Sequence, residues 1–125
     1  MSHNHHISIK REKYAPMAYN QPMEFIETPV FTRLILELIT DDEYRELQNV
    51  LVENPERGDI IRGGGGIRKL RHALPGTGKS GGIRVIYYWI TQEDQIFMLL
   101  AYPKSRKDNL TARETAILRD LVKEL

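Results

Sequence analysis

The stretch IRVIYYWI, residues 83–90, is the most strongly patterned part of the chain. Its residues are mainly β-branched or aromatic, which is typical of a β-strand. Apolar side chains on both faces after Arg84 indicate a strand at the centre of a sheet. A second central strand is predicted at Ile96–Tyr102 (IFMLLAY), after a turn at 91–94, and Pro103 ends it. The short link predicts an antiparallel hairpin, from which the rest of the sheet extends.

A third strand is predicted upstream of this hairpin, at Ile67–Leu74 (IRKLRHAL). Four consecutive glycines at 63–66 precede it and indicate a turn, because such a run does not form regular structure. Apolar and polar residues alternate imperfectly along this strand. The alternation places Arg68 and Leu70 on one face, and Ile67, Lys69 and Arg71 on the other.

Three helices are predicted from their capping residues and apolar spacing. Their starts are Thr28-Pro29, the capping box Thr40 to Glu43, and the capping box Thr111 to Glu114. The second helix is expected to stop near Asn54, because Pro55 disfavours a helical residue before it. The first two helices are joined by little more than a cap, so they are expected to form an antiparallel hairpin.

The predicted order is a short strand at Glu24–Glu27, two helices, three strands and a final helix. This order indicates an α+β fold with an antiparallel curved sheet of about four strands. An N-terminal helix hairpin and a C-terminal helix are expected to cover one side of the sheet. The folded domain is assigned to residues 23–125. Residues 1–22 are polar and read as a flexible N-terminal extension, either tag-like or upstream of the true start.

The composition of the whole chain limits its class. The chain has 125 residues, a formal net charge of +1 and no cysteine. Its length suits one domain, and the absence of cysteine excludes disulfides and thiolate metal sites. No apolar run approaches the roughly 20 residues that a membrane helix needs, and no secretory signal pattern is present. We therefore expect a cytoplasmic protein without a membrane contact.

The charge is distributed unevenly along the chain. No Asp or Glu occurs between Ile60 and Gln92. Such a basic stretch favours an anionic partner such as a nucleic-acid backbone, although a solvated basic surface is the plainer interpretation. The basic residues of this stretch are Arg62, Arg68, Lys69, Arg71, His72, Lys79 and Arg84.

The run PGTGKS, residues 75–80, is similar to the phosphate-binding loop of ATPases but differs in context. Ala73 occupies the position of the first required glycine, and a strand rather than a helix follows. Without a helix N-terminus the loop lacks the dipole and amide groups that hold phosphate, so no nucleotide binding is predicted. What remains is a Gly-rich loop between two strands, with Lys79 at its tip and Arg84 beyond it. Such groups bind a phosphodiester through charge-assisted hydrogen bonds.

Together these motifs resemble the RelE/HigB-type toxins of bacterial toxin–antitoxin systems. The resemblance rests on GGGGIRKLRHALPGTGKSGGIRVIYYWI (63–90) and FMLLAYPKSRKDNLTARE (97–114), and it extends over Met23–Leu125. It implies a toxin that cleaves mRNA in the ribosomal A site and that a cognate antitoxin neutralises. It further implies a reaction without metal or cofactor, in which a ribose 2′-OH attacks the adjacent phosphate and leaves a 2′,3′-cyclic phosphate.

The resemblance also assigns roles to residues of this chain. The implied catalytic residues are Lys79, Arg84, Tyr102 and Lys104, and the implied RNA-binding residues are Arg68, Lys69, Arg71, His72, Arg106 and Lys107. Neighbouring cations lower the pKa of a lysine, so Lys79 is a hypothesis for the general base. His72 is an alternative base, or else a partly buried strand residue.

Two other functions are compatible with the same basic strip. A ParE-like toxin of the same superfamily would poison gyrase and cleave no RNA. A non-catalytic RNA-binding module would keep the cations with no specific need for Lys79 or Tyr102. The partners implied by the main reading are the antitoxin, the ribosome and mRNA.

Overall fold

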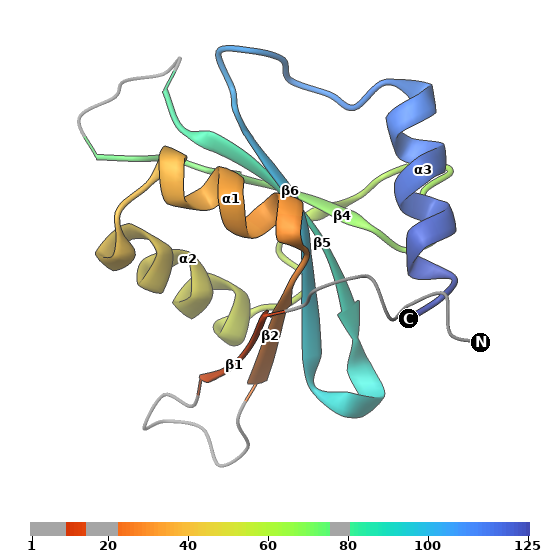
Figure 1. Ribbon diagram of the computed structural model, residues 1–125, viewed down its shortest axis with the longest axis horizontal. Coiled ribbons are helices and arrows are strands. Elements are labelled where there is room, and N and C mark those ends of the chain that lie inside the picture. The colour runs from red at the N-terminus through yellow and green to blue at the C-terminus, as the bar shows by residue number, and fades with distance from the viewer. Residues whose placement is uncertain (1–9, 15–22, 76–80) are drawn as a thin grey trace.

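A computed structural model describes residues 10–14, 23–75 and 81–125. Within these ranges six strands form one sheet in the order β1-β2-β6-β5-β4-β3 (Figure 1). The strands are β1 (Lys10–Tyr14), β2 (Met23–Glu27), β3 (Asp59–Ile60), β4 (Arg68–His72), β5 (Ile83–Ile90) and β6 (Gln95–Pro103). The described helices are α1 (Pro29–Leu38), α2 (Asp41–Glu53), α3 (Ala112–Val122) and a 3₁₀ turn, η2 (Thr91–Glu93).

The α+β class is confirmed, but the sheet differs from the predicted four antiparallel strands. β2 lies beside β6 and runs parallel to it, so the sheet is mixed. No hairpin turn joins these two strands, and local sequence therefore carried no sign of their pairing. β1 pairs with β2 at the sheet edge, within the predicted flexible extension. An edge strand tolerates charged residues, which explains why the polar stretch Lys10–Tyr14 showed no strand pattern.

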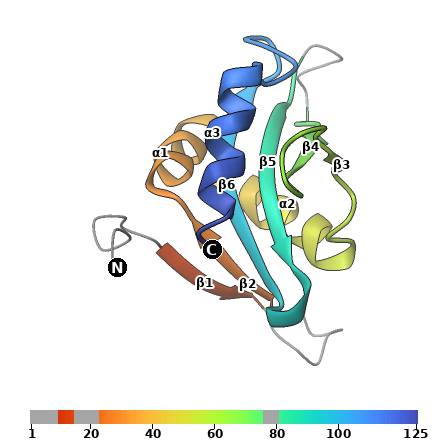
Figure 2. The same ribbon diagram turned by 90° about the vertical axis from the view of Figure 1, so that its right-hand side faces the viewer.

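The helices cover both faces of the sheet rather than one (Figures 1 and 2). On one face α1 and α2 contribute Phe31, Ile35, Leu47 and Leu51 to a buried cluster. On the other face Val122 of α3 packs in a second cluster with residues of β2, β5 and β6. This arrangement follows from the apolar residues on both sides of β5 and β6, since each side has to be removed from water.

The helix starts agree with the predicted caps. The Thr28 side chain accepts a hydrogen bond from the Phe31 amide at 3.0 Å. The capping boxes at Thr40–Glu43 and Thr111–Glu114 both form reciprocally. α2 ends at Glu53, one residue before the predicted stop. These caps satisfy amide groups that a helix leaves unpaired at its N-terminus.

A β-bulge in the central hairpin sets which side chains share a face. Ile86 pairs with Leu100, whereas the next residue, Tyr87, pairs with Met98, so β6 contains one extra residue there. Side chains alternate between faces along a strand, and one extra residue reverses the faces beyond it. Tyr102 therefore lies on the α3 face of the sheet, whereas Met98 lies on the opposite face. In a regular strand these two residues, an even number of positions apart, would share a face.

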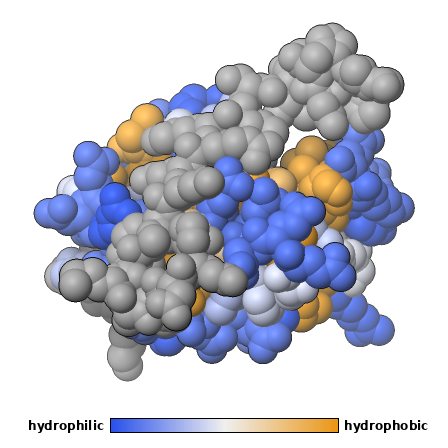
Figure 3. Space-filling model, turned by 90° about the horizontal axis from the view of Figure 1, so that it is seen from below, coloured by the Kyte–Doolittle hydropathy of each residue, from blue (hydrophilic) through white to orange (hydrophobic). Residues whose placement is uncertain are grey.

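None of the helices in the described ranges is long and apolar enough to cross a membrane. Figure 3 shows the end of the molecule near the β5–β6 turn, where the visible coloured surface is mainly hydrophilic with separate hydrophobic areas. The start of β5 and the end of β6, where Arg84 pairs with Tyr102, lie at the other end of the sheet (Figure 1).

Candidate functional site

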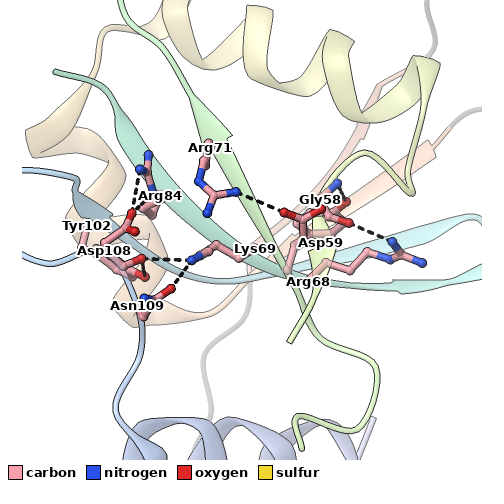
Figure 4. Close-up of polar contacts among 10 residues, drawn as sticks. Gly58, Asp59, Arg68, Lys69, Arg71, Arg84, Tyr102, Asp108 and Asn109 are labelled. Atoms are coloured by element: carbon pink, nitrogen blue, oxygen red, sulfur yellow. Dashed lines mark hydrogen bonds and ion pairs between the residues drawn. The ribbon is translucent and has the colours of Figure 1, made fainter. Parts of the chain in front are cut away.

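Three predicted site residues form a row across the sheet. Arg71 on β4 pairs with Arg84 on β5, and Arg84 pairs in turn with Tyr102 on β6. Lys69, two residues before Arg71, lies on the same face of β4. Residues from three strands are thus brought together on the α3 side of the sheet (Figure 4). We call Lys69, Arg71, Arg84 and Tyr102 the basic cluster.

The Arg84 side chain is held by a carboxylate from the loop between β6 and α3. Its Nε and Nη2 atoms donate hydrogen bonds of 2.9 and 2.7 Å to the same oxygen, Oδ1 of Asp108 (Figure 4). Arg84 is only 5% exposed. The hydrogen bond from Arg84 holds the pKa of Asp108 below its ordinary value, so this pair is ionised near neutral pH.

Lys69 and Tyr102 contact the backbone of the same loop residue. Nζ of Lys69 donates a 3.1 Å hydrogen bond to the carbonyl oxygen of Asp108 and another to Oδ1 of Asn109. The Tyr102 hydroxyl lies 3.4 Å from the same carbonyl oxygen. Burial, with the nearby Arg71 charge, lowers the pKa of Lys69, while burial raises the pKa of Tyr102.

The ring of Tyr102 also borders a cleft beside the β6–α3 loop. Nζ of Lys107 lies 5.0 Å from the ring centroid and pairs with Glu114 of α3. Arg106 and Lys107 line a cleft of about 250 Å³ together with Tyr102 and apolar residues of α1. Glu37 and Glu114 also line this cleft, so two acidic side chains offset its two cations.

The structure does not place every predicted residue in this cluster. Arg68 projects from the opposite face of β4, where Nη1 donates hydrogen bonds to the carbonyl oxygens of Gly58 (2.8 Å) and Glu56 (3.1 Å) (Figure 4). His72 shares that face by alternation, and burial lowers its pKa, opposed by Glu46 and Glu43 of α2.

Two further predicted residues, Lys79 and Lys104, are not part of the described cluster. Lys79 falls outside the described residues, so its predicted catalytic role stays a prediction. Lys104 follows β6, and its backbone amide donates a hydrogen bond to the Gly82 carbonyl at 3.1 Å. This bond ties the start of the β6–α3 loop to the start of β5.

Sequence reasoning missed Asp108 and Asn109, which complete the cluster. Neither residue is a cation, and neither belongs to a motif that binds phosphate. The available signal was an acidic residue within the otherwise basic segment PKSRKDN at 103–109. Its contact with Arg84, 24 residues earlier in the chain, depends on the fold.

The fold and the basic cluster together define the class of this protein. It is an α+β protein that carries arginine, lysine and tyrosine side chains on one face of its sheet. A family model described as the RelE toxin of the RelE/RelB toxin–antitoxin system matches residues 27–125. The match covers well over half of the chain, which therefore belongs to the RelE toxin family. The protein is a toxin of a toxin–antitoxin system, and an antitoxin is the partner that this membership implies.

The charge environment of Lys69 gives a testable expectation. Because the Arg71 charge contributes to lowering the pKa of Lys69, Arg71→Ala is expected to raise that pKa toward 10.5, as measured by NMR titration of the lysine side chain. The matched control is Arg68→Ala, which removes the same charge from the opposite face and is expected to leave the Lys69 pKa unchanged. An equal response to both substitutions would contradict the arrangement of the cluster.

Proposed function

We propose that this toxin is an endoribonuclease that cleaves mRNA in the A site of translating ribosomes. The observation that supports this function is the convergence of Lys69, Arg84 and Tyr102 on the two oxygen-bearing groups of Asp108. Side chains that converge on a carboxylate and a carbonyl oxygen are arranged to bind the oxygens of a phosphodiester. Family membership supports the toxin activity in general.

The proposed reaction is a transesterification without a metal ion. The ribose 2′-OH attacks the adjacent phosphorus and loses its proton to a base, and the bond from phosphorus to the 5′-oxygen breaks. The products are a 2′,3′-cyclic phosphate and a 5′-hydroxyl, the latter protonated by a general acid. The protein has to stabilise the added negative charge of the phosphorane that forms between these steps.

The residues of the cluster have properties that suit these tasks. Arg84 has a planar fork that binds two phosphate oxygens, and its charge does not depend on pH in the physiological range. Lys69, with a lowered pKa, is a candidate for the general base beside Lys79. We assign Tyr102 and Lys104 to contacts with the reacting phosphate. We assign Arg71, Arg106 and Lys107 to contacts with the RNA backbone. The predicted partners are the antitoxin, the ribosome and mRNA in the cytoplasm.

The experiment that tests this function is expression of the toxin in growing cells without its antitoxin, followed by mapping of RNA ends. We expect new 5′-hydroxyl ends within translated reading frames, matched by 2′,3′-cyclic phosphate ends, and their loss when the antitoxin is co-expressed. Intact mRNA with gyrase-linked DNA breaks would instead assign the protein to the ParE-like class. Growth arrest with intact mRNA and intact DNA would favour a non-catalytic RNA-binding module.

A further inference from the structure

The groups that would bind phosphate are covered by the chain itself. Lys69, Arg84 and Tyr102 are 8, 5 and 5% exposed, and the loop at 104–111 contacts all three through Asp108. A nucleic-acid backbone cannot approach these groups while the loop lies in this position. The side chain of Asp108 is 52% exposed, so the outer side of the cluster is occupied by an anionic residue in contact with solvent.

Asp108 presents its oxygens to the cluster as a phosphodiester would. One carboxylate oxygen accepts both hydrogen bonds from the Arg84 fork. The backbone carbonyl of the same residue accepts the hydrogen bond from Lys69 and lies within reach of the Tyr102 hydroxyl. Asp108 thus contacts two cations and a phenol at once. The positive charges of Arg84, Lys69 and Arg71 all favour the ionised form of the Asp108 carboxylate.

We propose that the loop at 104–111 is a cover for an oxyanion site and that Asp108 is an internal competitor of the RNA phosphate. This inference rests on the proposed function, because it takes RNA as the competing ligand. Substrate binding then requires that a phosphate oxygen replaces Asp108 on Arg84 and that the loop moves away from Lys69 and Tyr102.

The ends of the cover are anchored, which confines the movement to its middle. At one end the amide of Lys104 donates to Gly82 of the β4–β5 connection. At the other end the Thr111–Glu114 capping box fixes the start of α3. Displacement of the segment between these anchors removes the anion Asp108 from the cluster.

The test is the affinity for a probe that cannot be cleaved. The probe is a short single-stranded RNA with 2′-O-methyl groups at every ribose, followed by fluorescence anisotropy at fixed, low salt. Asp108→Asn is expected to bind it about tenfold or more tightly than the wild type, since removing the carboxylate charge weakens the internal charge-assisted hydrogen bonds.

The matched control is Asp120→Asn. It removes the same charge from α3, where Asp120 lies near Arg119 and Lys123. Its affinity is expected to stay within about twofold of the wild type, because a distant exposed charge is largely screened. Unchanged or weaker binding by Asp108→Asn would overturn the proposal and make Asp108 a residue that orients Arg84. Equal tightening by both variants, or no measurable binding by any of the proteins, would also overturn it.

A second measurement on the wild type covers the case in which Asp108→Asn does not fold. Amide hydrogen exchange of residues 105–110 is expected to rise when the 2′-O-methyl RNA binds, because the cover leaves its internal contacts. Increased protection of these amides on binding would contradict the proposal. Neither measurement involves cleavage, so a protein that behaves as expected here but cuts no mRNA would disprove the proposed function alone.

Discussion

Arg84→Ala is expected to reduce mRNA cleavage by about 10²–10³-fold, the usual effect of removing one donor to a developing oxyanion. Arg84 is the buried guanidinium of the basic cluster, and it already directs two hydrogen bonds to one carboxylate oxygen of Asp108; the same fork can bind a phosphate. The rate of single-turnover cleavage on ribosomes that carry a defined mRNA measures this effect, and the relief of growth arrest follows it in cells.

The same substitution is expected to leave the protein folded. The partner of Arg84, Asp108, is half exposed, so water replaces the lost hydrogen bonds and no charge is left buried and unpaired. The thermal unfolding temperature checks this expectation. A folded Arg84→Ala protein that cleaves at the wild-type rate would show that the site is elsewhere, and a large drop in unfolding temperature would make Arg84 a structural residue.

Two further variants separate geometry from charge. Arg68→Ala removes one positive charge from the opposite face of β4 and is expected to retain cleavage within a few-fold of the wild type. Arg84→Lys keeps the charge but loses the planar fork, and its rate is expected to lie between those of Arg84→Ala and the wild type. If Arg68→Ala lost as much activity as Arg84→Ala, the total positive charge rather than the cluster would explain the effect.

The second large effect is expected from the ribosome. Cleavage of mRNA on translating ribosomes is expected to be at least about 10³-fold faster than cleavage of the same RNA free in solution, because correct positioning of reacting groups lowers a barrier strongly. The cluster contains only a few cations, and Asp108 contacts two of them, Lys69 and Arg84, so the affinity of the cluster for free RNA is expected to be weak and sensitive to salt.

Purified toxin with either free mRNA or programmed ribosomes provides the comparison. The Arg84→Ala protein is the control for contaminating nucleases in both reactions. Chelation by EDTA, at concentrations that leave the ribosomes intact, is expected to have no effect on the rate. Efficient cleavage of free RNA would refute the dependence on the ribosome, and loss of activity in EDTA that added Mg²⁺ restores would refute the proposed metal-free reaction.

Much of this fold can be recognised locally in the sequence. The three helix starts follow from side-chain caps that lie within three residues of the groups they satisfy. The central strands follow from continuous β-branched and aromatic residues in Ile83–Ile90 and in Ile96–Tyr102. Arg84 could be selected because a charge inside such a strand requires a specific partner. These features can be predicted because the interactions that produce them join residues that are close together in the sequence.

Other features depend on contacts between distant segments. The parallel pairing of β2 with β6 and the position of α3 on the second face of the sheet have no local signal. Lys69 and Arg68 are adjacent in the chain, yet the strand places one in the basic cluster and the other on the opposite face. The amino-acid composition does not distinguish these two cations from each other.

The composition of the site itself was settled by tertiary structure. The bulge in β6 turns Tyr102 to the face of Arg84, whereas regular alternation from Met98 would have placed it on the other face. Asp108 reaches Arg84 because the loop folds back over the sheet after β6. Both outcomes depend on packing between residues that are far apart in the sequence. Local sequence patterns do not show which of these residues will be neighbours.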